Sequence, residues 1–406
     1  MKFTRRATVL FLFVLSVFTC QSQNMVTKVV GKDITTADIK VGAEQTATYF
    51  PWIKGKRIAV VANVTSMIKN THLVDSLVNA GFDIKKVFCP EHGFRGESEA
   101  GEDVVSTVDA KTKLPVVSLY GNNKKPKPED LADVDVVIFD IQDVGARFYT
   151  YISTMHYVME ACAENNKLFI VLDRPNPNGY YIDGPVLEKE FTSFVGMHPV
   201  PIVHGMTIAE YACMINGEKW LSNGIQCQLK FVKVYNYNHT DLYQLPQKPS
   251  PNLPTMESVY MYPTFCLFEG TCISVGRGTN RPFEIIGHPL LDSTGFSYTP
   301  HSIPGMSKKP LYEGLTCNGY DFKNYAAIFI KGYGRLYLFP LLELYKQLNS
   351  KTEFFNDYFD KLAGTAKLKQ QIISGATEEA IRKSWEPELE KFKQIRKKYL
   401  LYNDFE

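Results

Sequence analysis

The stretch Val134-Asp135-Val136-Val137-Ile138-Phe139-Asp140 decides the fold of this 406-residue chain. Four apolar residues follow one another at 136–139, whereas a strand with one face in water alternates apolar and polar residues. A strand that is apolar on both faces is typical of a parallel sheet covered by helices on both sides. Similar apolar runs recur at residues 57–63, 84–89, 115–119 and 168–172. Helical patterns at 71–80 and 151–164 lie between these runs, so the sequence predicts an α/β fold with a mostly parallel sheet.

Polar or turn-forming residues follow each predicted strand at its carboxyl end. These segments are Asn63, Pro90-Glu91-His92-Gly93, Tyr120-Gly121, Asp140-Ile141-Gln142-Asp143 and Asp173-Arg174-Pro175-Asn176. Ligands of open α/β sheets bind along the edge formed by the carboxyl ends of the strands. We therefore expect the five segments to converge on one crevice.

The loop Pro90-Glu91-His92-Gly93-Phe94-Arg95-Gly96 is the most distinctive of these segments. Its two glycines permit a tight turn in which the backbone approaches a ligand. Glu91, held at a strand end beside His92 and Arg95, is a candidate general acid. A structural salt bridge between Glu91 and Arg95 is the alternative.

Acidic residues continue beyond this loop, at Glu97, Glu99, Glu102 and Asp103. They could form a metal-binding loop, but neither an EF-hand spacing nor a His-x-x-x-His pair is present. A solvated acidic loop is the interpretation that we prefer, and we predict no metal.

The segment 140–151 follows the central strand and combines acids, an amide, an arginine and tyrosines. Its polar side chains include those of Asp140, Gln142, Asp143, Arg147, Tyr149 and Tyr151. This inventory suits sugar hydroxyls and a carboxylate, because arginine binds planar carboxylates through two parallel hydrogen bonds. Alternatively, the two tyrosines pack against the start of the next helix.

Another candidate ligand loop combines Gly276-Arg277-Gly278-Thr279 with Pro282-Phe283-Glu284. Two glycines around an arginine are similar to an anion-binding turn. Neither a G-x-G-x-x-G nor a P-loop motif follows any predicted strand, so we expect no nucleotide cofactor. A G-x-S-x-G nucleophile elbow is absent as well, which argues against a serine hydrolase.

The pattern of predicted strands and helices changes beyond residue 290. Before that point, Thr207 and Glu210 have the spacing of a helix-capping box. After it, we expect a strand at 326–330 and helices at 339–348 and 387–400. We therefore predict a catalytic α/β domain over 56–289 and a smaller α+β domain over 290–406.

The amino terminus has the features of an export signal. Lys2, Arg5 and Arg6 precede a ten-residue apolar run at 9–18, which is too short to span a bilayer. We expect a signal peptide over 1–22 and a lead-in segment over 23–55. Cleavage near Ser22 and lipidation at Cys20 remain alternatives, so the protein is expected to be exported, either periplasmic or lipid-anchored to a bacterial envelope.

Composition narrows the class of partner. The net charge is +2 with both signs evenly mixed, whereas a nucleic-acid-binding protein normally has a basic face. Aromatic residues make up 13% of the chain; most fill a core, and some tyrosines could line a groove for a sugar. Seven cysteines follow Cys20 without metal-type spacing, as expected of small buried apolar residues.

Several long blocks, in order, are similar to the signature blocks of the bacterial exo-β-N-acetylmuramidases. The blocks are 90–96, 140–151, Asp173-Arg174-Pro175-Asn176-Pro177, Asp183-Gly184-Pro185, Ser250-Pro251-Asn252-Leu253-Pro254 and 276–284. The resemblance runs from Lys56 to Tyr402, with Cys89 and His288 as local departures. It implies a Rossmann-like domain, a smaller domain and an active-site cleft between them. We predict no cofactor, because the motifs that bind nucleotides are absent.

The resemblance also implies an activity: removal of the non-reducing terminal N-acetylmuramic acid from muropeptides or disaccharides derived from peptidoglycan. It places the catalytic glutamate at Glu91. A glycosidase usually needs a second group, for which Asp140, Asp143, Glu284, a tyrosine or the substrate's own acetamido group are candidates. Arg147 or Arg277 is expected to clamp the lactyl carboxylate.

The full set of expected site residues follows from these blocks. The catalytic candidates are Glu91, His92, Asp140 and Asp143. The expected substrate-binding residues are Asn63, Arg95, Gln142, Arg147, Tyr149, Tyr151, Asp173, Arg174, Asn176, Asn252, Arg277, Thr279 and Glu284. A non-catalytic cell-wall sugar-binding protein and a metal-dependent hydrolase that uses the acidic 91–103 loop are the competing hypotheses.

Overall fold

The computed structural model describes residues 38–95, 107–326 and 331–406. The predicted signal peptide, Cys20 and the acidic residues at 97, 99, 102 and 103 lie outside the described residues. The predicted strand at 326–330 also lies outside them, apart from Ala326, whose backbone is helical (φ −58°, ψ −44°). Among the helices that are described, none is both long and apolar enough to cross a membrane.

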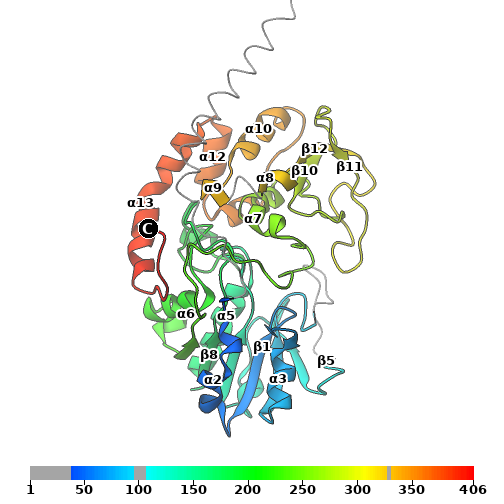
Figure 1. Ribbon diagram of the computed structural model, residues 1–406. Coiled ribbons are helices and arrows are strands. Elements are labelled where there is room, and N and C mark those ends of the chain that lie inside the picture. Colours follow the sequence, from blue (N-terminus) through cyan, green and yellow to red (C-terminus); the bar gives the residue numbers. More distant parts are fainter. Residues whose placement is uncertain (1–37, 96–106, 327–330) are drawn as a thin grey trace, which may run out of the picture.

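A seven-stranded sheet forms the centre of the first part of the chain (Figure 1). In spatial order, its strands are β5 (Thr107–Val108), β6 (Pro115–Ser118), β4 (Asp83–Cys89), β1 (Arg57–Ala62), β7 (Val136–Asp140), β8 (Leu168–Leu172) and β9 (Gln228–Val232). Every neighbouring pair is parallel except β5 with β6. Numbered along the chain, the six parallel strands have the order 3-2-1-4-5-6 of a Rossmann fold. The predicted Rossmann-like, mostly parallel sheet is confirmed.

Strand β7 has the buried character predicted from its sequence. All five of its residues are buried. Val137 and Phe139 belong to one core, and Val136 and Ile138 belong to the other. Successive side chains of a strand point to opposite faces of its sheet, so an apolar run fills a core on each side.

Helices cover both faces of the sheet. On one face, α2 (Thr46–Ile53) and α3 (Leu73–Asn79) contribute apolar side chains to the smaller core. On the other face, α5 (Tyr151–Glu164) and α6 (Ile208–Gly217) contribute to the larger core. The capping box of α6 is present, because the main-chain N–H of Thr207 donates to the Glu210 carboxylate at 2.9 Å.

The second part of the chain combines helices with a small antiparallel sheet (Figure 1). The sheet contains β10 (Ile285–His288), β12 (Cys317–Asp321) and β11 (Ser297–Tyr298), in that order. The helices are α7 (Met256–Phe265), α8 (Lys323–Tyr325), α9 (Lys331–Tyr333), α10 (Phe339–Leu348), α11 (Phe359–Ala363), α12 (Lys367–Ile373) and α13 (Glu378–Lys397). The domain boundary at 289/290 stays a prediction; β10 precedes it and pairs with β12, which follows it.

Helix α13 and the residues after it run back along the first part of the chain (Figure 1). The Arg396 guanidinium donates to the carbonyl oxygen of Gly205 and forms an ion pair with Asp404 at 2.7 Å. The Tyr402 hydroxyl donates to Asp173, which follows β8. These contacts fix the end of the chain against the carboxyl edge of the sheet.

Candidate active site

The loop after β4 holds Glu91 at the carboxyl edge of the sheet. His92 and Gly93 both have left-handed backbones (φ 71° and 74°), and the N–H of Gly93 bonds to the carbonyl oxygen of Pro90 at 3.1 Å. This tight turn leaves Glu91 half-buried, while His92 is buried and lines a small recess together with Glu91. Oε2 of Glu91 accepts a 3.0 Å hydrogen bond from the Thr150 hydroxyl, at the start of α5.

Glu91 lines a cavity of about 360 Å³, within the range of small-molecule sites. The polar, charged and aromatic side chains in its wall include Glu91, Tyr120, Phe148, Thr150, Phe194, Tyr262, Glu269, Arg277, Tyr358 and Lys361. They come from both parts of the chain, so the cavity lies at the junction between the parts. Aromatic rings beside acids and cations suit a sugar, which presents apolar ring faces and polar hydroxyls.

Two further hollows adjoin this cavity. A recess of about 60 Å³ shares Glu91, Thr150 and Arg277 with it. A larger cavity of about 600 Å³ shares Glu269 and Arg277. The three hollows have lining residues in common and therefore adjoin one another, and we refer to them together as the cleft.

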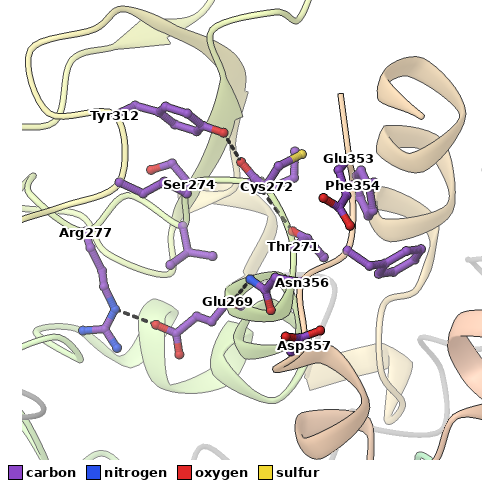
Figure 2. A pocket seen from close by; sticks show the side chains of 14 residues that line it. Glu269, Thr271, Cys272, Ser274, Arg277, Tyr312, Glu353, Phe354, Asn356 and Asp357 are labelled. Atoms are coloured by element: carbon purple, nitrogen blue, oxygen red, sulfur yellow. Dashed lines mark hydrogen bonds and ion pairs between the residues drawn. The ribbon is translucent and has the colours of Figure 1, made fainter. Parts of the chain in front are cut away.

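Arg277 and Glu269 line both of the larger cavities, and Figure 2 shows them in the wall of the 600 Å³ one. Nε of Arg277 donates to Oε1 of Glu269 at 2.6 Å, and the guanidinium lies 5.2 Å from the centre of the Phe283 ring. Arg277 thus lies in the cleft, as predicted for a substrate-binding residue. Glu269, in the 3-10 helix η5 (Cys266–Gly270), is its carboxylate partner.

Tyr149, Tyr151 and Asn252 line the small recess. Both tyrosine hydroxyls donate to the carbonyl oxygen of Pro249, at 2.9 and 3.2 Å. Nδ2 of Asn252 donates to the carbonyl oxygen of Met306 at 2.8 Å. The two tyrosine rings also pack edge to face, 4.7 Å apart. The tyrosine hydroxyls and Nδ2 of Asn252 are thus bonded to backbone, whereas the buried Oδ1 of Asn252 has no hydrogen-bond partner among the described residues.

Asp140 and Arg174 form a buried ion pair instead of facing the cavity. Their side chains meet at 2.6 Å, and Arg174 also donates to the carbonyl oxygen of Met67 at 3.0 Å. Beside them, the Asn63 side-chain oxygen accepts two hydrogen bonds from Thr65. Asn63 follows β1 and Asp140 ends β7. The strand order of a Rossmann sheet reverses between these two strands, and ligands usually bind there. In this protein, side chains fill that crevice, so the expected catalytic role of Asp140 is not supported.

Arg147 is not the expected carboxylate clamp. Its guanidinium is buried and donates to four main-chain carbonyl oxygens at 2.8 Å, those of Pro185, Val200, Leu362 and Ala363. Burial lowers the pKa of Arg147 to about 9. Two of these carbonyls belong to the end of α11, so Arg147 fastens the second part of the chain to the first.

Asp143 and Gln142 are buried below the floor of the cleft. Oδ2 of Asp143 accepts a 2.9 Å hydrogen bond from the N–H of Gly145, and burial raises the pKa of Asp143 to about 7. Nε2 of Gln142 donates to the carbonyl oxygens of Asp143 and Pro175. Neither side chain lines the three hollows, which removes the geometric basis for a catalytic Asp143.

Asp173 and Asn176 hold neighbouring segments together. Asp173 accepts hydrogen bonds from the hydroxyls of Thr207 and Tyr402, and burial raises its pKa to about 7. Nδ2 of Asn176 donates to the carbonyl oxygen of Met206 at 2.9 Å. Both residues were expected to bind substrate, but the structure gives them contacts within the fold.

Arg95 forms ion pairs with Asp75 and Asp109, at 3.0 and 2.9 Å, and so anchors the loop rather than binding substrate. The predicted alternative, in which Glu91 is the partner of Arg95, therefore loses its basis.

Thr279 and Glu284 also have structural contacts. The Thr279 hydroxyl donates to the carbonyl oxygen of Gly276 at 2.7 Å, within the turn that carries Arg277. Glu284 accepts hydrogen bonds from Thr255 and Arg281. Neither residue lines the cleft, and both support the loop from behind.

Tyr120, from one of the five segments expected to converge, lines the cavity, whereas Phe194, Tyr262, Glu269, Tyr358 and Lys361 were missed from the sequence. Glu269 had one usable signal, because it is a lone carboxylate beside the apolar run Cys266-Leu267-Phe268. The others lie outside the predicted motifs. Across 38–95, 107–326 and 331–406, no group of three or more His, Cys, Asp or Glu side chains could hold a metal ion.

Comparisons with known proteins show the family of this chain. The models of the exo-β-N-acetylmuramidase NamZ family match residues 58–257 (N-terminal part) and 260–402 (C-terminal part). A relative from Bacillus subtilis strain 168, the peptidoglycan β-N-acetylmuramidase NamZ, is 42% identical over 379 residues, covering 87% of this chain and 89% of the relative.

Two crystal structures of DUF1343 family proteins from Bacteroides fragilis NCTC 9343 have the same fold. One is 44% identical with a TM-score of 0.84, and the other is 30% identical with a TM-score of 0.76. Each comparison covers 90% of this chain and 99% of the other chain. Because both family models and the Bacillus relative match it, this chain belongs to the exo-β-N-acetylmuramidase NamZ family.

Proposed function

We propose that this protein is an exo-acting glycoside hydrolase that releases the non-reducing terminal N-acetylmuramic acid from peptidoglycan fragments, in cell-wall turnover or recycling. The observation that carries the proposal is the half-buried Glu91 carboxyl in the wall of an aromatic-lined cavity at the junction of the two parts of the chain. Family membership and the name of the Bacillus relative support the choice of sugar.

Glu91 is the general acid in this proposal. Its proton passes to the glycosidic oxygen while the bond from that oxygen to the anomeric carbon breaks. The Thr150 hydroxyl positions the carboxyl through its 3.0 Å hydrogen bond, and the buried His92 lines the small recess together with Glu91. Arg277 lines the cleft, is bonded to Glu269 and contacts the substrate in this proposal.

An assay of the disaccharide N-acetylmuramyl-N-acetylglucosamine tests this function. The wild-type enzyme is expected to release free N-acetylmuramic acid, with the product anomer giving the stereochemistry. Glu91→Gln is expected to lose most of this activity, while Glu386→Gln, on the exposed face of α13, is the matched control. Binding of the disaccharide without release by the wild-type protein would instead identify a sugar-binding protein.

We also propose that the protein is exported, with a signal peptide over 1–22. The basic residues at 2, 5 and 6 and the short apolar run at 9–18 support this. Two mature forms are consistent with the sequence, one cleaved near Ser22 and periplasmic, the other lipidated at Cys20. Metabolic labelling with palmitate, compared between wild type and Cys20→Ser, distinguishes them.

A further inference from the structure

We propose that Glu269 is the second catalytic carboxylate, the group that acts at the anomeric carbon while Glu91 protonates the leaving oxygen. The inference rests on the proposed glycosidase function. In the inverting form of the reaction, the Glu269 carboxylate takes a proton from the water whose oxygen bonds to the anomeric carbon. In the retaining form, it bonds to that carbon itself, and water then releases the sugar with Glu91 as the base.

The first line of support is the composition of the cavity wall. Of the described residues that line the 360 Å³ cavity, Glu91 and Glu269 are the two with carboxyl groups. A glycosidase of the common type needs two carboxyl groups beside the scissile bond. The other acids considered from the sequence, Asp140, Asp143 and Glu284, do not line this cavity.

The second line of support is that Glu269 is fixed yet accessible. Oε1 accepts from Nε of Arg277 at 2.6 Å, and Oε2 accepts from the Cys266 thiol at 3.5 Å. The carbonyl oxygen of Glu269 also accepts from Nδ2 of Asn356 at 3.2 Å (Figure 2). Its side chain nevertheless keeps 23% of its surface exposed. Catalysis favours such a preorganised charge, because no reorganisation is then needed during the reaction.

The third line of support is the proximity of the two carboxyl groups to one phenol. Partial burial raises the pKa of Tyr358, and the nearby acidic groups of Cys266, Glu269 and Glu91 raise it further. Glu91, Glu269 and Tyr358 all line the same cavity. In this assignment Arg277 is a positioning residue for Glu269, in addition to its contact with substrate.

The test compares Glu269→Gln with wild type and Glu91→Gln in the disaccharide assay. We expect kcat of Glu269→Gln to fall by about 10²–10⁴-fold, the range for a positioned acid or base, with KM changed far less. Binding of the product N-acetylmuramic acid, measured by calorimetry, should stay within a few-fold of wild type. Glu386→Gln is the matched control, because Glu386 is exposed on α13 and lines none of the three hollows.

Chemical rescue separates a catalytic role from a structural one. Added azide is expected to raise the rate of Glu269→Ala, because a small anion can replace the missing carboxylate. If Glu269→Gln or Glu269→Ala does not fold, Glu269→Asp keeps the charge and retracts it by one methylene, and kcat should still fall. A Glu269→Gln enzyme with near wild-type kcat, or a variant changed in KM alone, would overturn the assignment. A wild-type enzyme that releases no sugar would overturn the proposed function itself.

Discussion

The hydroxyl of Thr150 donates a 3.0 Å hydrogen bond to Oε2 of Glu91, although the two residues lie 59 positions apart in the chain. Glu91 follows β4, and Thr150 is the residue that precedes α5. The bond therefore ties the loop after one strand to the first turn of the helix that follows another.

Thr150→Val is expected to reduce kcat/KM by about 10–100-fold, because a hydrogen bond to a charged or positioned group contributes about 1.5–3 kcal/mol. The substitution preserves the shape of the side chain and removes only the donor. Steady-state kinetics with the disaccharide measure the effect. Thr154→Val, one turn further along α5, should retain wild-type kinetics. Equal losses in both variants would mean that Thr150 acts through the helix and not through Glu91.

Arg147→Met is expected to lower the free energy of unfolding by about 3–5 kcal/mol, because buried carbonyl oxygens lose their donors. Chemical denaturation measures this loss. Arg57→Met removes a solvent-exposed ion pair with Asp135 and should lower the stability far less. The KM of folded Arg147→Met should stay near wild type; a large rise in KM limited to substrates with the lactyl carboxylate would restore the clamp role.

Asp143→Asn is expected to become more stable relative to wild type as the pH rises from 5 to 8. Burial raises the pKa of Asp143 in the folded protein to about 7, well above the ordinary aspartate value of about 3.9. The folded state therefore binds more protons than the unfolded state between these values, and wild-type stability falls as the pH rises through 7. The neutral amide avoids this loss.

The size of the effect follows from the shift, since one pKa unit corresponds to about 1.4 kcal/mol. A difference of a few kcal/mol is expected at pH 8 and little difference at pH 4. Thermal unfolding across this range measures it, with the exposed Asp38→Asn as the control. Activity should persist in Asp143→Asn, because Asp143 does not line the cleft. A loss of activity as large as that of Glu91→Gln would instead indicate a catalytic role for Asp143.

Treatment with a chelator is expected to leave the release of N-acetylmuramic acid unchanged, because the proposed reaction uses carboxyl groups alone. The measurement is the disaccharide assay after dialysis against EDTA. Loss of activity that returns on adding a divalent cation would favour the metal-dependent hydrolase, whose predicted ligands at 97, 99, 102 and 103 lie outside the described residues.

The sequence by itself determined the sheet, the capping box of α6 and the loop that carries Glu91. The physical reason is that these features are local. An apolar run such as 136–139 must be buried on both faces, and Thr207 and Glu210 satisfy N–H groups only a few residues away.

The tertiary structure alone decided which polar residues at the edge of the sheet face the cavity. Asp140 pairs with Arg174, which lies 34 positions further along the chain. Arg147 donates to the carbonyl oxygen of Ala363, at a separation of 216 positions. Buried polar groups must be paired, and a partner so distant in the chain is invisible in the local pattern. Glu269 was missed for the same reason, because only folding brings it to the cavity that Glu91 lines.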